Sequence, residues 1–252
     1  MSNKDNKDIS RRDFLKTTGI ATGTLIGGGL IGGLIGYNTN KTAVPTKPSN
    51  IGPHNTTNKT AETSEGKMFF TTDKDFNIVA TATERIFPKD DLGPGAIDLG
   101  VPYFIDRQLA GQYGSNSKEY MQGPFSVGLP TQGYQTRLTR ADIFRQGIEK
   151  LDTEAQKRYN KSFTDISDKE RDVILTAFQK DEVKMQGVTA SFFFNLLRSA
   201  TLEGAYSDPL YGGNRNMEGW KMKGFPGHQM SYINVIEKPG FQKIEPRSLG
   251  MH

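Results

Sequence analysis

The sequence contains no cysteine, one tryptophan and three histidines among its 252 residues. The absence of cysteine excludes disulfides, cysteine-ligated zinc, iron–sulfur clusters, thiol catalysis and c-type haem attachment in this chain. Its fold must therefore be stable without covalent cross-links. Apolar residues are also few, at 35%, yet aromatic residues reach 10%. This aromatic content is too high for a disordered chain, so we expect a folded domain.

Most of the chain has almost no excess of positive charge. The formal net charge is +4, but residues 1–41 contain six basic and three acidic side chains. Residues 42–252 therefore hold 26 basic and 25 acidic side chains, a net charge of +1. A domain that binds nucleic acid is expected to hold its positive charge in its folded part. The charge distribution therefore argues against nucleic acid as a partner.

The N-terminal 37 residues have the order of an export signal, with a charged region before an apolar one. The stretch from residue 10 to 16 reads Ser-Arg-Arg-Asp-Phe-Leu-Lys and precedes an uncharged, glycine-rich run. It resembles a twin-arginine (Tat) signal through Arg11, Arg12, Phe14 and Leu15. This resemblance implies recognition by the Tat translocase, which carries proteins that have already folded. We therefore expect the folded part on the outer face of the bacterial cytoplasmic membrane.

Whether this signal is removed stays open, because the residues before Val44 form a poor cleavage site. If it is retained, residues 17–37 are long enough to anchor the chain, since ~20 residues span the ~30 Å apolar core of a bilayer. Residues 38–68 are rich in Asn, Thr, Pro and Lys and cannot bury enough apolar surface to fold. We interpret them as a flexible linker.

Residues 69–252 are predicted to form a single, mainly α-helical domain. Apolar spacings of three and four residues predict helices over 73–87, 101–109 and 190–206, and from 139 through 151 and 167 through 178. Ser167 with Glu170 is a capping box, and Thr139 with Asp142 resembles one, with Asp in place of the usual Glu. Both predict helix starts. The most apolar helix, 190–206, is expected at the centre, with Phe192, Phe193, Leu196, Leu197 and Ala200 facing the core.

From Ser207 onward no helical period is visible, and glycine and proline recur. The only tryptophan, Trp220, lies in this part of the chain together with Tyr211 and Phe225. A long loop without regular structure is uncommon in a domain and is usually functional or disordered. Because of its aromatic residues, we predict an ordered surface shaped by glycine.

A partial calcium motif begins this domain. Asp73, Asp75, Asn77 and Glu84 follow the spacing of an EF-hand loop. The sixth position of that loop must be glycine for its sharp turn, but here it is Ile78. The same residues form a good helix start, which is the interpretation we adopt.

Catalytic motifs are equally incomplete. Ser126 lies in a stretch similar to the G-x-S-x-G nucleophile elbow, but with one residue too many. Asp90 and Asp91 are adjacent, so their side chains point apart, and a turn after Pro88 explains them better. His228 is the only histidine in the ordered part. We therefore expect no catalytic site, metal site or cofactor in this chain.

Three stretches resemble one family, the gluconate 2-dehydrogenase subunit 3 family. The first is Glu84-Arg-Ile-Phe-Pro-Lys-Asp-Asp with Gly93-Pro-Gly-Ala-Ile-Asp-Leu-Gly-Val-Pro and Phe104-Ile-Asp-Arg-Gln-Leu-Ala. The second is Phe192-Phe-Phe-Asn-Leu-Leu-Arg with Thr201-Leu-Glu-Gly. The third and most specific is Asp208-Pro-Leu-Tyr-Gly-Gly-Asn214 with Gly219-Trp220 and Gly224-Phe-Pro-Gly227.

The resemblance implies a small gamma subunit of a membrane-bound dehydrogenase. In this family the catalytic subunit is a separate, larger flavoprotein that holds FAD, and a third subunit is often a multihaem cytochrome c. The small subunit is implied to bind the flavoprotein, to aid its maturation and to supply its export signal. The resemblance does not identify the sugar or sugar acid that is oxidised. An independent exported binding domain is the alternative.

The third stretch is the predicted contact with the partner. Tyrosine, tryptophan and phenylalanine are typical anchors of protein interfaces. The predicted interface comprises Tyr211, Gly212, Gly213, Asn214, Gly219, Trp220, Phe225, Pro226 and Gly227. A second interpretation stays open, in which Tyr211 and Trp220 fold back on the helix that contains Phe192 and Leu196 and close the domain's own core.

Overall fold

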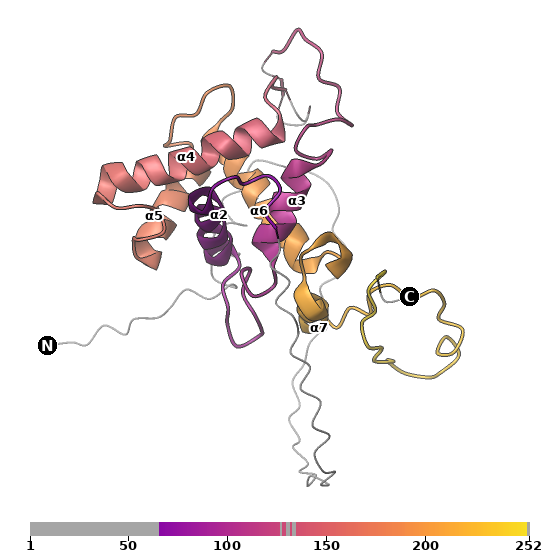
Figure 1. Ribbon diagram of the computed structural model, residues 1–252. Coiled ribbons are helices and arrows are strands. Elements are labelled where there is room, and N and C mark those ends of the chain that lie inside the picture. The colour runs from indigo at the N-terminus through magenta and orange to yellow at the C-terminus, as the bar shows by residue number, and fades with distance from the viewer. Residues whose placement is uncertain (1–65, 127, 130–131, 133–134, 251–252) are drawn as a thin grey trace, which may run out of the picture.

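The computed structural model describes residues 66–126, 128–129, 132 and 135–250. The predicted signal, 1–37, and all but the last three residues of the predicted linker, 38–68, lie outside them. The described residues form six α-helices and no strand, which confirms the mainly α fold (Figure 1). The helices, labelled as in Figure 1, are α2 (Asp73–Ile86), α3 (Val101–Ala110), α4 (Arg140–Tyr159), α5 (Asp168–Gln179), α6 (Ala190–Tyr206) and α7 (Glu218–Lys223).

Hydroxyl side chains begin four of these helices. Thr72 accepts a hydrogen bond from the Asp75 backbone N–H, so the stretch with calcium-loop spacing is the first turn of α2. Both predicted capping boxes are confirmed. The Asp142 carboxylate accepts from the Thr139 N–H at 3.1 Å, and the Glu170 carboxylate accepts from the Ser167 N–H at 2.7 Å. Each such cap contributes ~1 kcal/mol to helix stability.

Helix α6 is the central helix, as predicted, and packs against α2, α3, α4, α5 and α7. Its Phe193 ring lies edge-on to Phe144 of α4 and to Phe178 of α5, with centroid distances of 5.6 and 5.7 Å. A Cβ atom at Gly147 of α4 would overlap the Phe193 ring, so glycine permits this close helix crossing.

The buried face of α6 differs in part from the prediction. Phe193, Leu197 and Ala200 are buried as expected, but Phe194 is buried in place of the predicted Phe192 and Leu196, which are only half-buried. Because α6 is surrounded on several sides, its buried surface is wider than one amphipathic stripe.

The C-terminal segment contains more helix than predicted. After α6 the chain forms two 3-10 turns, η1 (Pro209–Tyr211) and η2 (Arg215–Met217), and then α7. Helix α7 has only six residues, less than two turns, so its sequence cannot show a helical period. Beyond α7 the chain is irregular and forms the yellow loop that extends away from the helices in Figure 1. None of the helices in the described part of the chain is long and apolar enough to cross a membrane.

Candidate partner interface

The predicted contact stretch begins where the chain leaves α6. Asp208 caps η1 by accepting a hydrogen bond from the Leu210 N–H at 2.9 Å. Gly212 and Asn214 then adopt left-handed backbone angles, with φ of 96° and 45°. These two reversals turn the chain back toward the end of α6. The segment is therefore a folded corner rather than an extended loop.

Asn214 holds this corner together. It is fully buried, and its side-chain amide donates to the Ser207 carbonyl and accepts from the Gly219 N–H, both at 2.8 Å. Gly213 and Gly219 lie so close to the last turn of α6 that a Cβ atom on either would overlap a backbone carbonyl oxygen there. The glycines of this stretch thus serve close backbone packing.

Trp220 points into the domain. Its side chain is 5% exposed, and its indole N–H donates to the Tyr206 carbonyl at the end of α6, at 2.7 Å. Phe225 packs edge-on against it, with ring centroids 5.4 Å apart. The placement of Trp220 therefore agrees with the second interpretation, in which this residue closes the domain's own core. Trp220 packs against the end of α6.

The nine predicted interface residues divide by placement. Gly213, Asn214, Gly219 and Trp220 are buried, whereas about half of the surface of Tyr211 and of Phe225 is exposed. Contact with a partner stays a prediction for the whole stretch, and these two exposed rings are the groups available to make it. The remaining members, Gly212, Pro226 and Gly227, shape the backbone around them.

A second set of contacts, here called the clasp, closes the C-terminal segment on itself. Asp208 accepts hydrogen bonds from the Ser248 hydroxyl at 2.6 Å and from the Leu249 N–H at 2.8 Å. The Arg247 N–H donates to the Pro226 carbonyl at 3.1 Å, and the Arg247 carbonyl accepts from the His228 N–H at 2.7 Å. The clasp therefore brings residues 247–249 back to the start of the segment.

The contacts of the clasp change the pKa of the Asp208 carboxyl. Burial raises the pKa of this carboxyl, but the hydrogen bonds from Ser248 and from two backbone N–H groups outweigh it. The net result is a pKa below the ordinary value for aspartate. The charged form of Asp208 is therefore the one that the clasp requires.

Three charged residues in the first family-like stretch have structural roles that their sequence pattern did not predict. Asp106 of α3 is fully buried and accepts hydrogen bonds from the backbone N–H groups of residues 68, 69 and 70. Glu84 accepts from the Ile97 N–H at 2.9 Å, and Arg85 makes two contacts with the Asp172 carboxylate. A carboxylate on the apolar face of α3, next to Ile105, was the signal that could have revealed Asp106.

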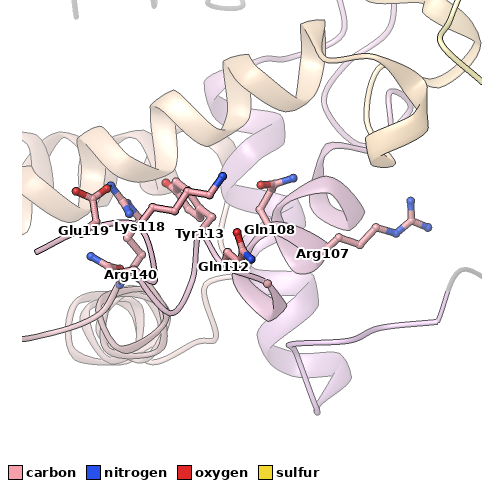
Figure 2. A pocket seen from close by; sticks show the side chains of 9 residues that line it. Arg107, Gln108, Gln112, Tyr113, Lys118, Glu119 and Arg140 are labelled. Atoms are coloured by element: carbon pink, nitrogen blue, oxygen red, sulfur yellow. Dashed lines mark hydrogen bonds and ion pairs between the residues drawn. The ribbon is translucent and has the colours of Figure 1, made fainter. Parts of the chain in front are cut away.

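A polar pocket of about 450 Å³ lies between the end of α3 and the start of α4 (Figure 2). Arg140 pairs with Glu119 at 2.8 Å and stacks over the Tyr113 ring. Lys118 borders the same pocket, whereas the Arg107 side chain points away from Arg140 in Figure 2. Such polar walls suit a polar ligand better than an apolar one.

An adjacent hollow links this pocket to the predicted interface. It is lined by Phe104, Gln108 and Glu203 together with the exposed Tyr211. Desolvation raises the pKa of Glu203, and the positive charge of Arg140 partly offsets that rise. The exposed Tyr211 ring thus lies in a hollow of mixed polarity beside α3 and α6.

The residues that the sequence offered as chemical motifs lie in turns and irregular segments of the backbone. Asp90 forms a turn in which its carboxylate accepts from the Leu92 N–H at 2.9 Å, as predicted. Ser126 lies in an irregular segment, with neither a strand before it nor a helix directly after it among the described residues. Within the same residues, no group of three or more His, Asp and Glu side chains is placed to hold a metal ion.

Comparison with known proteins gives one match. The family model described as Gluconate 2-dehydrogenase subunit 3 matches residues 73–227, from the start of α2 to four residues beyond the end of α7. No curated protein and no solved structure matches. The matched range contains all six helices and the predicted contact stretch.

Proposed function

The chain belongs to the gluconate 2-dehydrogenase subunit 3 family, and we propose that it is the non-catalytic small subunit of a membrane-associated, FAD-dependent sugar or sugar-acid dehydrogenase. The observation that carries this proposal is the family match, which covers the whole helical body. FAD and the reacting groups belong to a separate, larger subunit. This chain contributes binding surface, and Tyr211 and Phe225 are the exposed aromatic residues of the predicted contact stretch.

The second part of the proposal concerns export. The small subunit aids maturation of the flavoprotein and carries it through the Tat translocase to the outer face of the cytoplasmic membrane. The pattern of Arg11, Arg12, Phe14 and Leu15 supports this role. The lack of cysteine also supports it, because this chain can fold before export without an oxidising compartment. A cytochrome c subunit would then accept the electrons.

Purification from the native host tests the subunit role. The full chain carries a C-terminal tag, membranes are solubilised gently, and the absorption spectrum and the masses of co-purified chains are recorded. We expect a yellow complex with a larger flavoprotein that oxidises sugars or sugar acids. A colourless chain purified alone would instead support an independent exported domain.

Replacement of the arginine pair tests the escort role separately. In the double variant Arg11→Lys, Arg12→Lys, we expect both this chain and the flavoprotein to stay in the cytoplasm, because the Tat signal is lost. Immunoblots of cytoplasmic and membrane fractions provide the measurement. A flavoprotein that still reaches the outer face would show that it does not depend on this chain.

A further inference from the structure

Residues 228–246, here called the arm, leave the helical body just beyond the end of the family match. The arm is the loop that extends past α7 in Figure 1. It displays five large apolar side chains at its surface, and four of them are at least 75% exposed. These residues are Met230, Tyr232, Ile233, Ile236 and Phe241. Soluble monomers rarely display apolar side chains in such a cluster unless it binds something.

The arm is anchored at both of its ends. The clasp joins Arg247 to Pro226 and His228, and the Gln229 side chain donates to the Pro226 carbonyl at 2.8 Å. Within the arm, the Tyr232 carbonyl accepts from the N–H groups of Val235 and Ile236, both at 2.9 Å. The apolar side chains are therefore presented from a loop with a fixed base.

A cavity lies where the arm meets the body. Its volume is about 320 Å³, and its walls include Trp220 and Phe225 on one side and Phe241 and Pro246 on the other. Aromatic walls of this kind receive a large apolar side chain of a partner, as in the central pockets of protein interfaces. Phe241 belongs both to the exposed apolar residues of the arm and to the cavity wall, so the cavity borders the arm. Lys221, Lys243 and Glu245 also line the cavity.

The charge of the arm favours a protein partner over a membrane surface. Its charged side chains are Glu237, Lys238, Lys243 and Glu245, which cancel. Loops that lie on anionic lipid generally add basic residues to their apolar ones. Interface cores between proteins are instead depleted of net charge and rich in aromatic residues and methionine.

The exposed area of the arm is also of the right size. The five apolar residues together expose on the order of 700 Å², if a large side chain offers ~150–250 Å². A standard protein interface buries about 800 Å² on each partner. The arm alone therefore provides most of one side of a stable interface.

We propose that the arm and the cavity beside Trp220 are a docking surface for the large subunit of the dehydrogenase complex, which inserts an apolar side chain between Phe225 and Phe241. This inference rests on the proposed function, because that function supplies the partner. It adds a location that the family match does not cover. The expected partner surface is an uncharged apolar segment with at least one large aliphatic or aromatic side chain.

Substitutions on the full-length tagged chain test the docking surface in the native host. In the arm variant Ile233→Ser, Ile236→Ser we expect flavin co-purification to fall by about tenfold or more, since each anchor contributes more than a factor of five to binding. The control is Val173→Ser, which removes an exposed apolar side chain from α5, far from the arm in Figure 1. We expect the control to retain the flavoprotein, and both variants to melt like the unmodified chain.

Photo-crosslinking gives a second readout. A benzoylphenylalanine at position 236 is expected to cross-link to the flavoprotein subunit, whereas one at position 173 on α5 is not. Cross-links between two copies of this chain, or a requirement for anionic vesicles, would overturn the inference. Unchanged flavin recovery in the arm variant would overturn it while leaving the proposed function intact. If the unmodified chain brings down no flavoprotein, the proposed function fails as well.

Discussion

The two halves of the C-terminal segment use similar residues in opposite ways. In residues 208–227, Trp220 is 5% exposed and its indole N–H bonds to the end of α6. In the arm, Phe241 is 90% exposed. Both halves contain glycine, proline and aromatic residues. The comparison teaches that the aromatic residues of such a segment can complete a core or form an exposed surface, and that the backbone contacts of the segment decide which.

The physical difference lies in the partners of the backbone. Gly213 and Gly219 let the first half approach α6 closely, and Asn214 satisfies the polar groups that this approach buries. Buried polar groups must find such partners, which fixes the corner in place. The arm is joined to the body at its ends, and its other hydrogen bonds are short-range turns within the arm itself, so its side chains remain on the outside.

The largest effect is expected from Trp220→Ala. Loss of this buried ring should lower the free energy of unfolding by about 3–5 kcal/mol, because truncating a buried tryptophan leaves a cavity. Urea denaturation of the purified chain measures the change. A variant that unfolds at the same urea concentration but loses its partner would place Trp220 in the interface instead and would break the comparison.

The next effect is expected from Asn214→Ala. The substitution leaves the Gly219 N–H and the Ser207 carbonyl without their partner, which should cost about 2–3 kcal/mol of unfolding free energy. Asn216→Ala is a matched control, because Asn216 also has a positive φ, of 56°, but lies at the surface. If both variants lose the same unfolding free energy, the cause is the positive backbone angle and not the hydrogen bonds of Asn214.

A smaller, pH-dependent effect is expected at the clasp. Because the folded pKa of Asp208 lies below its unfolded value, its stabilisation is complete above the unfolded pKa and is lost as the pH falls toward the folded pKa. The clasp should therefore open progressively below about pH 4. Hydrogen exchange of the Leu249 N–H, expressed as a protection factor, measures this opening. Asp208→Asn should remove the pH dependence of this protection factor. A protection factor that stays constant with pH in the unmodified chain would refute the prediction.

The smallest effect is expected from Phe241→Ala. Since this side chain is 90% exposed, the free energy of unfolding should change by less than about 0.5 kcal/mol. Urea denaturation under the conditions used for Trp220→Ala provides the direct contrast. A loss as large as that of Trp220→Ala would mean that the arm packs on the body, and the two halves would no longer differ.

The helical body was readable from the sequence because its signals are local. Thr139 with Asp142, and Ser167 with Glu170, fix helix starts within three residues, and the apolar spacing predicted the bounds of α6. The sequence did not predict which residues of the predicted interface are buried and which are exposed. It depends on Asn214 meeting the end of α6 and on Asp208 meeting Ser248, and no local pattern encodes either contact. Helix α7 was missed because six residues are too few to show a period.

The way in which the clasp closes the C-terminal segment also determines in which compartment the segment can fold. Asp208 and Ser248 are 40 residues apart in the sequence, and hydrogen bonds alone close the loop between them. In many small exported domains a disulfide closes loops of this kind, and that bond forms only after the chain reaches an oxidising compartment. This closure requires no oxidant, so it forms equally well on either side of the membrane. Under the proposed export route, the arm would therefore have its final shape before the chain leaves the cytoplasm.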